Sequence, residues 1–107
     1  MLSYMNVIPA KESVSRGEAL NLLGGVANDG EAVALDIRVW GRVDRRWTPL
    51  AVQRAELQKN EHRHLYFTLG PECFSEDRWG EQIGEIELII SDREPEQAAT
   101  GSMIFVE

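Results

Sequence analysis

The sequence predicts an all-β fold, an antiparallel β-sandwich of about seven strands that forms one domain over residues 1–107. Turn residues interrupt the chain at intervals of about 8 to 12 residues, the spacing of short strands. Between the turns, apolar residues recur at alternate positions, as they do in a strand with one buried face. Hydrophobic residues make up 43% of the chain, which is long enough to bury a core without disulfides.

Three strands are expected in the first part of the chain. Residues 5–9 end at Pro9, which is typical of an edge strand because proline donates no main-chain hydrogen bond. Residues 19–27 contain Gly24 and Gly25, which indicate a bulge or a close main-chain approach. Residues 32–43 alternate most clearly. Their core side carries Val33, Leu35, Ile37 and Val39, and their outer side carries Ala34, Asp36, Arg38, Trp40 and Arg42.

The next expected strand covers residues 47–57. Its two halves fit opposite registers, so we place a bulge near Gln53-Arg54. The stretch after Pro49 is also rich in helix formers, and a helix of about two turns is the alternative there.

Three further strands and a long connection complete the pattern. Residues 62–69 direct Leu65, Phe67 and Leu69 to the core and His62, His64, Tyr66 and Thr68 outward. Residues 70–82 form a long connection that holds a helical turn within residues 71–79. Residues 84–91 form a strand with Ile86, Leu88 and Ile90 inside, and residues 102–106 form the last strand.

Two stretches stand out, "SRGEALNLLGGVANDGEAVALDIRVW" and "GEIELIISDRE". They resemble the immunoglobulin-like modules of the CARDB type found in bacteria and archaea. By itself, Asn28-Asp29-Gly30 between apolar runs favours a hairpin turn. The resemblance instead implies a corner that carries the chain from one sheet to the other. It further implies that residues 19–27 pair with 62–69, and that residues 33–42 pair with 84–91.

Charge and cysteine content restrict the partners and the compartment. Eleven basic and 18 acidic residues give a net charge of −7, which disfavours nucleic acids and anionic membranes as partners. The longest apolar run, "IELII", is far shorter than the roughly 20 residues of a membrane span. The lone cysteine and the absence of a secretory signal predict a cytoplasmic location for a freestanding protein. An extracellular or cell-surface location follows if the chain is excised from a longer exported protein.

Candidate reactive residues give no catalytic pattern. His62 and His64 share a strand face, but no third metal ligand is evident. Cys73 lies among acidic residues, which disfavour its thiolate. Glu85 and Glu87 are typical of a solvated face, and the acidic loop 92–96 lacks the regular oxygen spacing of a calcium loop. We therefore expect no catalytic residues, no cofactor and no metal, and hence no enzyme.

The tryptophans are the candidate binding residues. Trp40 lies between Arg38 and Arg42 on the outer side of its strand, where cation–π stacking is expected. Trp47 and Trp79 either join Trp40 in an exposed patch or close the ends of the sandwich. The favoured hypothesis is a noncatalytic protein-interaction or structural module that binds a protein partner or itself through the Arg38-Trp40-Arg42 face. The alternative is a carbohydrate-binding module that uses Trp40, Trp47 and Trp79.

Overall fold

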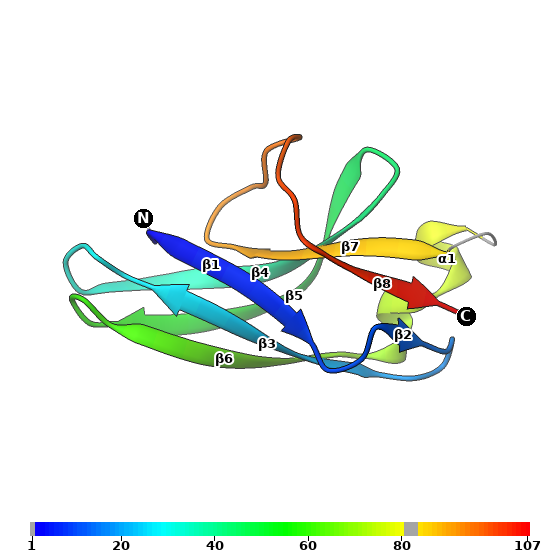
Figure 1. The fold of residues 1–107 in the computed structure, drawn as a ribbon, viewed down its shortest axis with the longest axis horizontal. Coiled ribbons are helices and arrows are strands. Elements are labelled where there is room, and N and C mark those ends of the chain that lie inside the picture. The colour runs from blue at the N-terminus through cyan, green and yellow to red at the C-terminus, as the bar shows by residue number, and fades with distance from the viewer. Residues whose placement is uncertain (1, 81–83) are drawn as a thin grey trace.

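In the computed structural model, which describes residues 2–80 and 84–107, the chain forms two β-sheets packed face to face (Figure 1). One sheet has the strand order β1-β3-β6 and the other β2-β8-β7-β4-β5. The strands are β1 (Tyr4–Pro9), β2 (Ser13–Val14), β3 (Leu20–Ala27), β4 (Val33–Val43), β5 (Arg46–Leu57), β6 (His62–Leu69), β7 (Glu85–Ser91) and β8 (Ser102–Val106). The predicted all-β sandwich is confirmed. One more strand is present than expected, because the two-residue β2 pairs in parallel with β8.

The long connection between β6 and β7 holds the helical structure expected there. A 3₁₀ helix covers Pro71–Phe74 and the four-residue helix α1 covers Glu76–Trp79. The alternative helix after Pro49 is wrong, since those residues belong to β5 and β6. In the described ranges, no helix is long and apolar enough to cross a membrane.

The strand pairing confirms the corner and both expected partnerships. β3 pairs with β6 from Leu20↔Leu69 to Ala27↔His62, and β4 pairs with β7. β3 and β4 therefore lie in different sheets, which excludes a hairpin at residues 28–30. β1 pairs with β3 in unbroken register, so Gly24 and Gly25 mark no bulge. They mark a close approach, because a Cβ on Gly24 would lie 2.8 Å from Ile90 Cδ1.

The bulge expected at Gln53-Arg54 lies elsewhere in β5. Val39 pairs with Ala51 and Trp40 with Pro49, which leaves Leu50 as the extra residue. Because Leu50 is the extra residue, Ala51 points to the same side of the sheet as the buried Ala55 and Leu57. Val52 consequently faces outward and is 57% exposed. The predicted position of the bulge was wrong because an apolar residue at position 52 has the character of a core residue.

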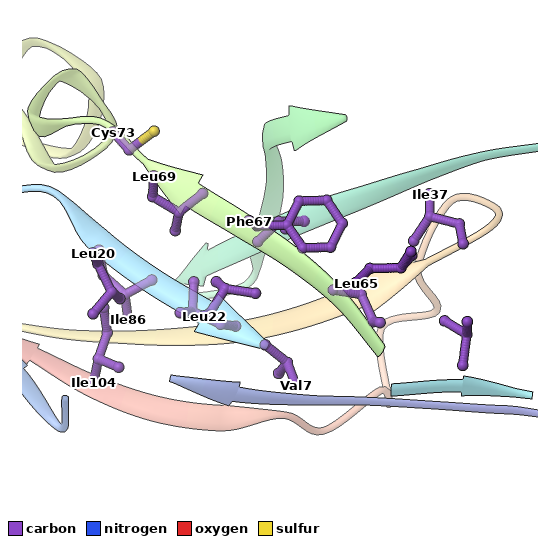
Figure 2. Close-up of a cluster of buried hydrophobic side chains, with 14 of the residues drawn as sticks. Val7, Leu20, Leu22, Ile37, Leu65, Phe67, Leu69, Cys73, Ile86 and Ile104 are labelled. Carbon is purple, nitrogen blue, oxygen red and sulfur yellow. The ribbon is translucent and has the colours of Figure 1, made fainter. Parts of the chain in front are cut away.

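The core lies between the two sheets, where side chains from both converge (Figure 2). Leu20, Leu22, Leu65, Phe67 and Leu69 come from the three-stranded sheet, and they pack against Ile37, Ile86 and Ile104 of the other sheet. Each is at most 6% exposed. Burial of these side chains contributes about 1.5 to 3 kcal/mol apiece before conformational entropy is counted.

Asn28 fixes the two connections that cross between the sheets at one end of the sandwich. Its side chain is 1% exposed. Its Nδ2 donates to the carbonyl oxygens of Glu31 and Gln58, both at 3.0 Å, and its Oδ1 accepts from Gly30 N. Its main-chain N–H donates to Glu61 O at 2.9 Å. One buried residue thus joins the β3–β4 corner to the turn between β5 and β6.

We predict that Asn28→Asp lowers the free energy of unfolding by about 2 to 5 kcal/mol. The substitution removes both Nδ2 donors and leaves the carbonyls of Glu31 and Gln58 facing a carboxylate, and each unsatisfied group costs about 1 to 3 kcal/mol. Urea unfolding measures the change. The exposed neighbour provides the control, since Asp29→Asn should change stability by less than about 0.5 kcal/mol. Equal effects at the two positions would contradict this role of Asn28.

Candidate binding surfaces

Arg42 of β4 is largely buried in an ion pair with Glu87 of β7. The two side chains are 17% and 15% exposed, and Arg42 Nε donates to Glu87 Oε1 at 3.0 Å. The guanidinium also donates to the carbonyl oxygens of Gln97 and Ala99. Glu87 Oε2 accepts from Gly101 N at 2.7 Å. The pair therefore holds the loop between β7 and β8 against the outer side of the five-stranded sheet.

Trp47, and not Trp40, is the cation–π partner of Arg42. The guanidinium carbon lies 4.3 Å from the centroid of the Trp47 ring. The two residues are opposite one another in the β4–β5 pairing, which brings the side chains together. Trp47 Nε1 donates to Glu96 O at 3.1 Å, so this ring also contacts the β7–β8 loop. The expectation of stacking along β4 was wrong because the cross-strand neighbour is better placed than the residue two positions away.

Trp40 faces outward from β4, as its register requires, but it is only partly exposed. It lies between Pro49 of β5 and Ile89 of β7. Its Nε1 is buried and has no hydrogen-bond partner among the described residues. Arg38, on the same side of the strand, is 44% exposed and lies 4.0 Å from a carboxylate oxygen of Asp36.

Trp79 packs at one end of the sandwich. Its Nε1 donates to Cys73 O at 2.6 Å, and its ring packs against the core. The ring also lies beside Gly41, where a Cβ would be 3.4 Å from Trp79 Cη2. Of the two expected positions for Trp79, an exposed patch or the end of the sandwich, the geometry therefore fits the second.

Trp47 and Trp79 nevertheless border one shared depression, here called the tryptophan hollow. It lies between the β4–β5 turn and α1, and Arg78 Nη1 donates across it to Pro49 O at 3.2 Å. The residues that line it are Val43, Asp44, Arg46, Trp47, Thr48, Pro49, Arg78 and Trp79. Trp40, Arg38 and Arg42 are not among them, so the structure divides the predicted site residues between two places.

The outer side of the three-stranded sheet is a second surface, here called the neutral face. The pairing of β1, β3 and β6 directs to it Tyr4, Asn6, Ile8, Asn21, Leu23, His62, His64, Tyr66 and Thr68. None of these residues is Asp, Glu, Lys or Arg, although 27% of the chain is charged. Tyr66 is 79% exposed, Tyr4 57% and Ile8 54%. Ile8, Leu23 and Tyr66 lie in one cross-strand row and line a shallow apolar groove.

Alternation within single strands predicts several residues of the neutral face only as outward positions. It places His62, His64, Tyr66 and Thr68 on the wet side of their strand, but it does not indicate what lies beside them. The signal for the surface is the absence of charged residues at alternate positions of three separate strands. Only the pairing of those three strands brings these positions together into one surface.

The candidate reactive groups lie in different environments. Cys73 is 3% exposed. Burial, helped by the neighbouring Glu72 carboxylate, raises the pKa of the Cys73 thiol above its usual value. His62 and His64 are both exposed on the neutral face. Within residues 2–80 and 84–107, no three His, Cys, Asp or Glu side chains gather where they could hold a metal ion.

Comparison with known proteins shows likeness in structure only. No protein-family model matches the chain, and no curated protein matches it in sequence. A β-glucosidase from Erythrobacter marinus is similar over 99% of this chain, with a TM-score of 0.75 and 22% identity. A β-glucosidase from Listeria innocua, solved with glucose, is similar over 96%, with a TM-score of 0.65 and 17% identity. The chain spans 16% of the length of each enzyme.

We predict that Arg42→Met lowers the free energy of unfolding by about 3 to 5 kcal/mol, because it leaves the largely buried Glu87 carboxylate without its cation. Arg38→Met is the matched control, and its exposed ion pair should be worth less than about 1 kcal/mol. Urea unfolding of both variants measures the difference. Adding Glu87→Gln to Arg42→Met should recover part of the loss. Equal free energies of unfolding for Arg42→Met and Arg38→Met would show that Arg42 does not hold the loop.

Proposed function

We propose that this protein is a noncatalytic, immunoglobulin-like interaction module of the CARDB kind that binds another protein through the neutral face. The observation that carries the proposal is the exposure of Tyr66, Tyr4 and Ile8 on a sheet face without charged residues. The centres of protein interfaces are depleted of charged residues and enriched in aromatic ones. Such a face loses its water at low cost, because no charge has to be desolvated.

The neutral face is a better contact surface than the Arg38-Trp40-Arg42 face considered from the sequence. Arg42 is already engaged by Glu87 and by the β7–β8 loop. Trp40 is only partly exposed, whereas Tyr66 exposes 79% of its surface. The partly exposed Trp40 is therefore a poorer anchor for a partner than Tyr66.

Two further observations agree with a binding role. The Cys73 thiol is buried and its pKa is raised, which is the reverse of an activated nucleophile. The similar solved structures are β-glucosidases in which the matching region is 16% of the chain. Because the matching region is a small part of those chains, we propose that this sandwich likewise contacts other polypeptide.

Site-specific photo-crosslinking tests this proposal. A benzoylphenylalanine residue at position 66 should crosslink to a protein partner in cells of the source organism, with mass spectrometry identifying the adduct. The same residue at position 54, exposed on β5 of the other sheet, is the control and should give several-fold less adduct. Equal adduct yields at positions 66 and 54 would contradict the proposed role of the neutral face.

A second candidate function is saccharide binding in the tryptophan hollow. The observation in its favour is that Trp47 and Trp79 border one depression together with Asp44, Thr48 and Arg46. Aromatic rings next to hydrogen-bonding side chains can pack against the C–H face of a sugar ring while binding its hydroxyl groups.

Titration with neutral oligosaccharides, followed by tryptophan fluorescence, tests this candidate. Binding should quench the emission of the wild-type protein, and Trp47→Phe should weaken binding about tenfold, the effect of a loss near 1.4 kcal/mol. Trp40→Phe is the control, since Trp40 lies outside the hollow. Folded protein that gives no fluorescence change and no signal on a glycan array would exclude this function.

A further inference from the structure

The β6 strand forms an open edge of the three-stranded sheet. The order β1-β3-β6 leaves one side of β6 without a neighbouring strand, as the lower margin of Figure 1 shows. The bond from Asn28 N to Glu61 O shows that the odd-numbered residues of this segment direct their main-chain groups toward β3. In an antiparallel pair these groups alternate. The even-numbered residues, His62, His64, Tyr66 and Thr68, therefore direct their N–H and C=O groups away from the sheet.

The other edges of the two sheets are protected in ways that β6 is not. β5 contains Pro49, the bulge at Leu50 and the charged Arg54 and Glu56. β1 is covered on its free side, where Ser102 Oγ donates to Val7 O at 2.8 Å. β2 is only two residues long. Proline, bulges, charges, covering and short strands are the devices that prevent edge-to-edge association. β6 has eight residues in regular register, with no proline and no bulge.

The charge of β6 favours a second copy of this chain as its partner. Each copy carries a net charge of −7, so most surfaces of two copies repel one another. β6 contains no Asp or Glu. Its one charged residue of the Lys or Arg type, Arg63, is paired with Glu61 at 2.8 Å. Two β6 strands can therefore approach without bringing carboxylates from the strands together.

We propose that two copies of this protein pair through β6, antiparallel and around a two-fold axis, to form a continuous six-stranded sheet. Opposite residues must point to the same side of the sheet. An axis beside Leu65 satisfies this condition and uses all the free main-chain groups. It places His64 across from Tyr66 of the second copy, and His62 across from Thr68 of the second copy. The two neutral faces then join into one surface. This pairing goes beyond the proposed function, since its partner is a second copy and its contact is the strand edge.

The first test is the mass in solution together with amide exchange. Light scattering after size-exclusion chromatography should show a monomer at low concentration and a dimer at high concentration. The amides of His62, His64, Tyr66 and Thr68 should become protected from hydrogen exchange only in the dimer. A monomer at every concentration up to the millimolar range overturns the proposal. The free edge of β6 would then be open to a different chain.

His64→Pro tests the role of the main chain. It removes an N–H that points away from β3, so the sheet within each copy keeps its own hydrogen bonds. The dimer dissociation constant should rise about a hundredfold, tenfold for the bond lost from each copy. His64→Thr keeps the N–H and should dimerise like the wild type. Equal losses of dimer affinity in His64→Pro and His64→Thr would overturn edge pairing and indicate a contact through the His64 side chain.

A crosslink provides a second test that does not depend on how the strand accepts proline. Residues 62 and 68 lie roughly 20 Å apart along one strand and cannot form a disulfide within one copy. In the proposed dimer they are opposite one another, so His62→Cys/Thr68→Cys should give a disulfide-linked dimer on mild oxidation. Neither single substitution should give this disulfide-linked dimer. Absence of the crosslink while the dimer persists overturns the pairing.

Tyr66→Thr separates this proposal from the proposed function. It keeps the β6 main chain and removes the exposed ring of the neutral face. The dimer should persist in Tyr66→Thr, while adducts to other proteins from a benzoylphenylalanine at position 4, on β1 of the same face, should be lost. Failure of the photo-crosslinking experiment therefore leaves the dimer intact, and failure of dimerisation leaves the neutral face available to another protein.

Discussion

The buried amide of Asn28 is the contact on which the sandwich depends. A β-sandwich encloses a core only if the chain crosses from one sheet to the other without leaving unpaired polar groups behind. Here two crossings meet at one end of the molecule, and the Asn28 side chain bonds to Glu31 O on one and to Gln58 O on the other. Because Asn28 is only 1% exposed, water competes little for these bonds, and the crossings hold one another in place. That junction sets how β3 in one sheet packs against β4 in the other, and therefore where the core lies.

The outer sides of the two sheets differ because only one has a loop folded against it. Arg42 and Glu87 hold the β7–β8 loop on the five-stranded sheet, where Trp47 and Ile89 gain contacts that neither would have on a bare sheet. On the three-stranded sheet Tyr66, Tyr4 and Ile8 are exposed, and the outward side chains of its strands are uncharged. The largest exposed aromatic side chain, Tyr66, thus lies on the sheet whose outward strand residues are uncharged.

The two proposed contacts on β6 use different chemistry. Side chains of the neutral face present apolar area and specificity, whereas the strand edge presents main-chain donors and acceptors that any extended strand can satisfy. A second copy can satisfy them without bringing strand carboxylates together, because β6 carries none. The same strand can therefore serve a homotypic contact at its edge and a heterotypic contact on its face, and dimerisation would double the face offered to a partner.

Alternation along the chain was enough to place seven of the strands and, outside β5, the sides that they bury. Alternation decided that Leu65, Phe67 and Leu69 point inward and that Trp40 points outward, because side chains in a strand follow a strict two-residue repeat. It could not locate the bulge at Leu50 or identify Trp47 as the partner of Arg42, since both depend on which residue lies opposite on another strand. The neutral face and the open edge of β6 also emerged only from the tertiary structure. A surface is assembled from strands far apart in the chain, and local periodicity carries no information about which strands become neighbours.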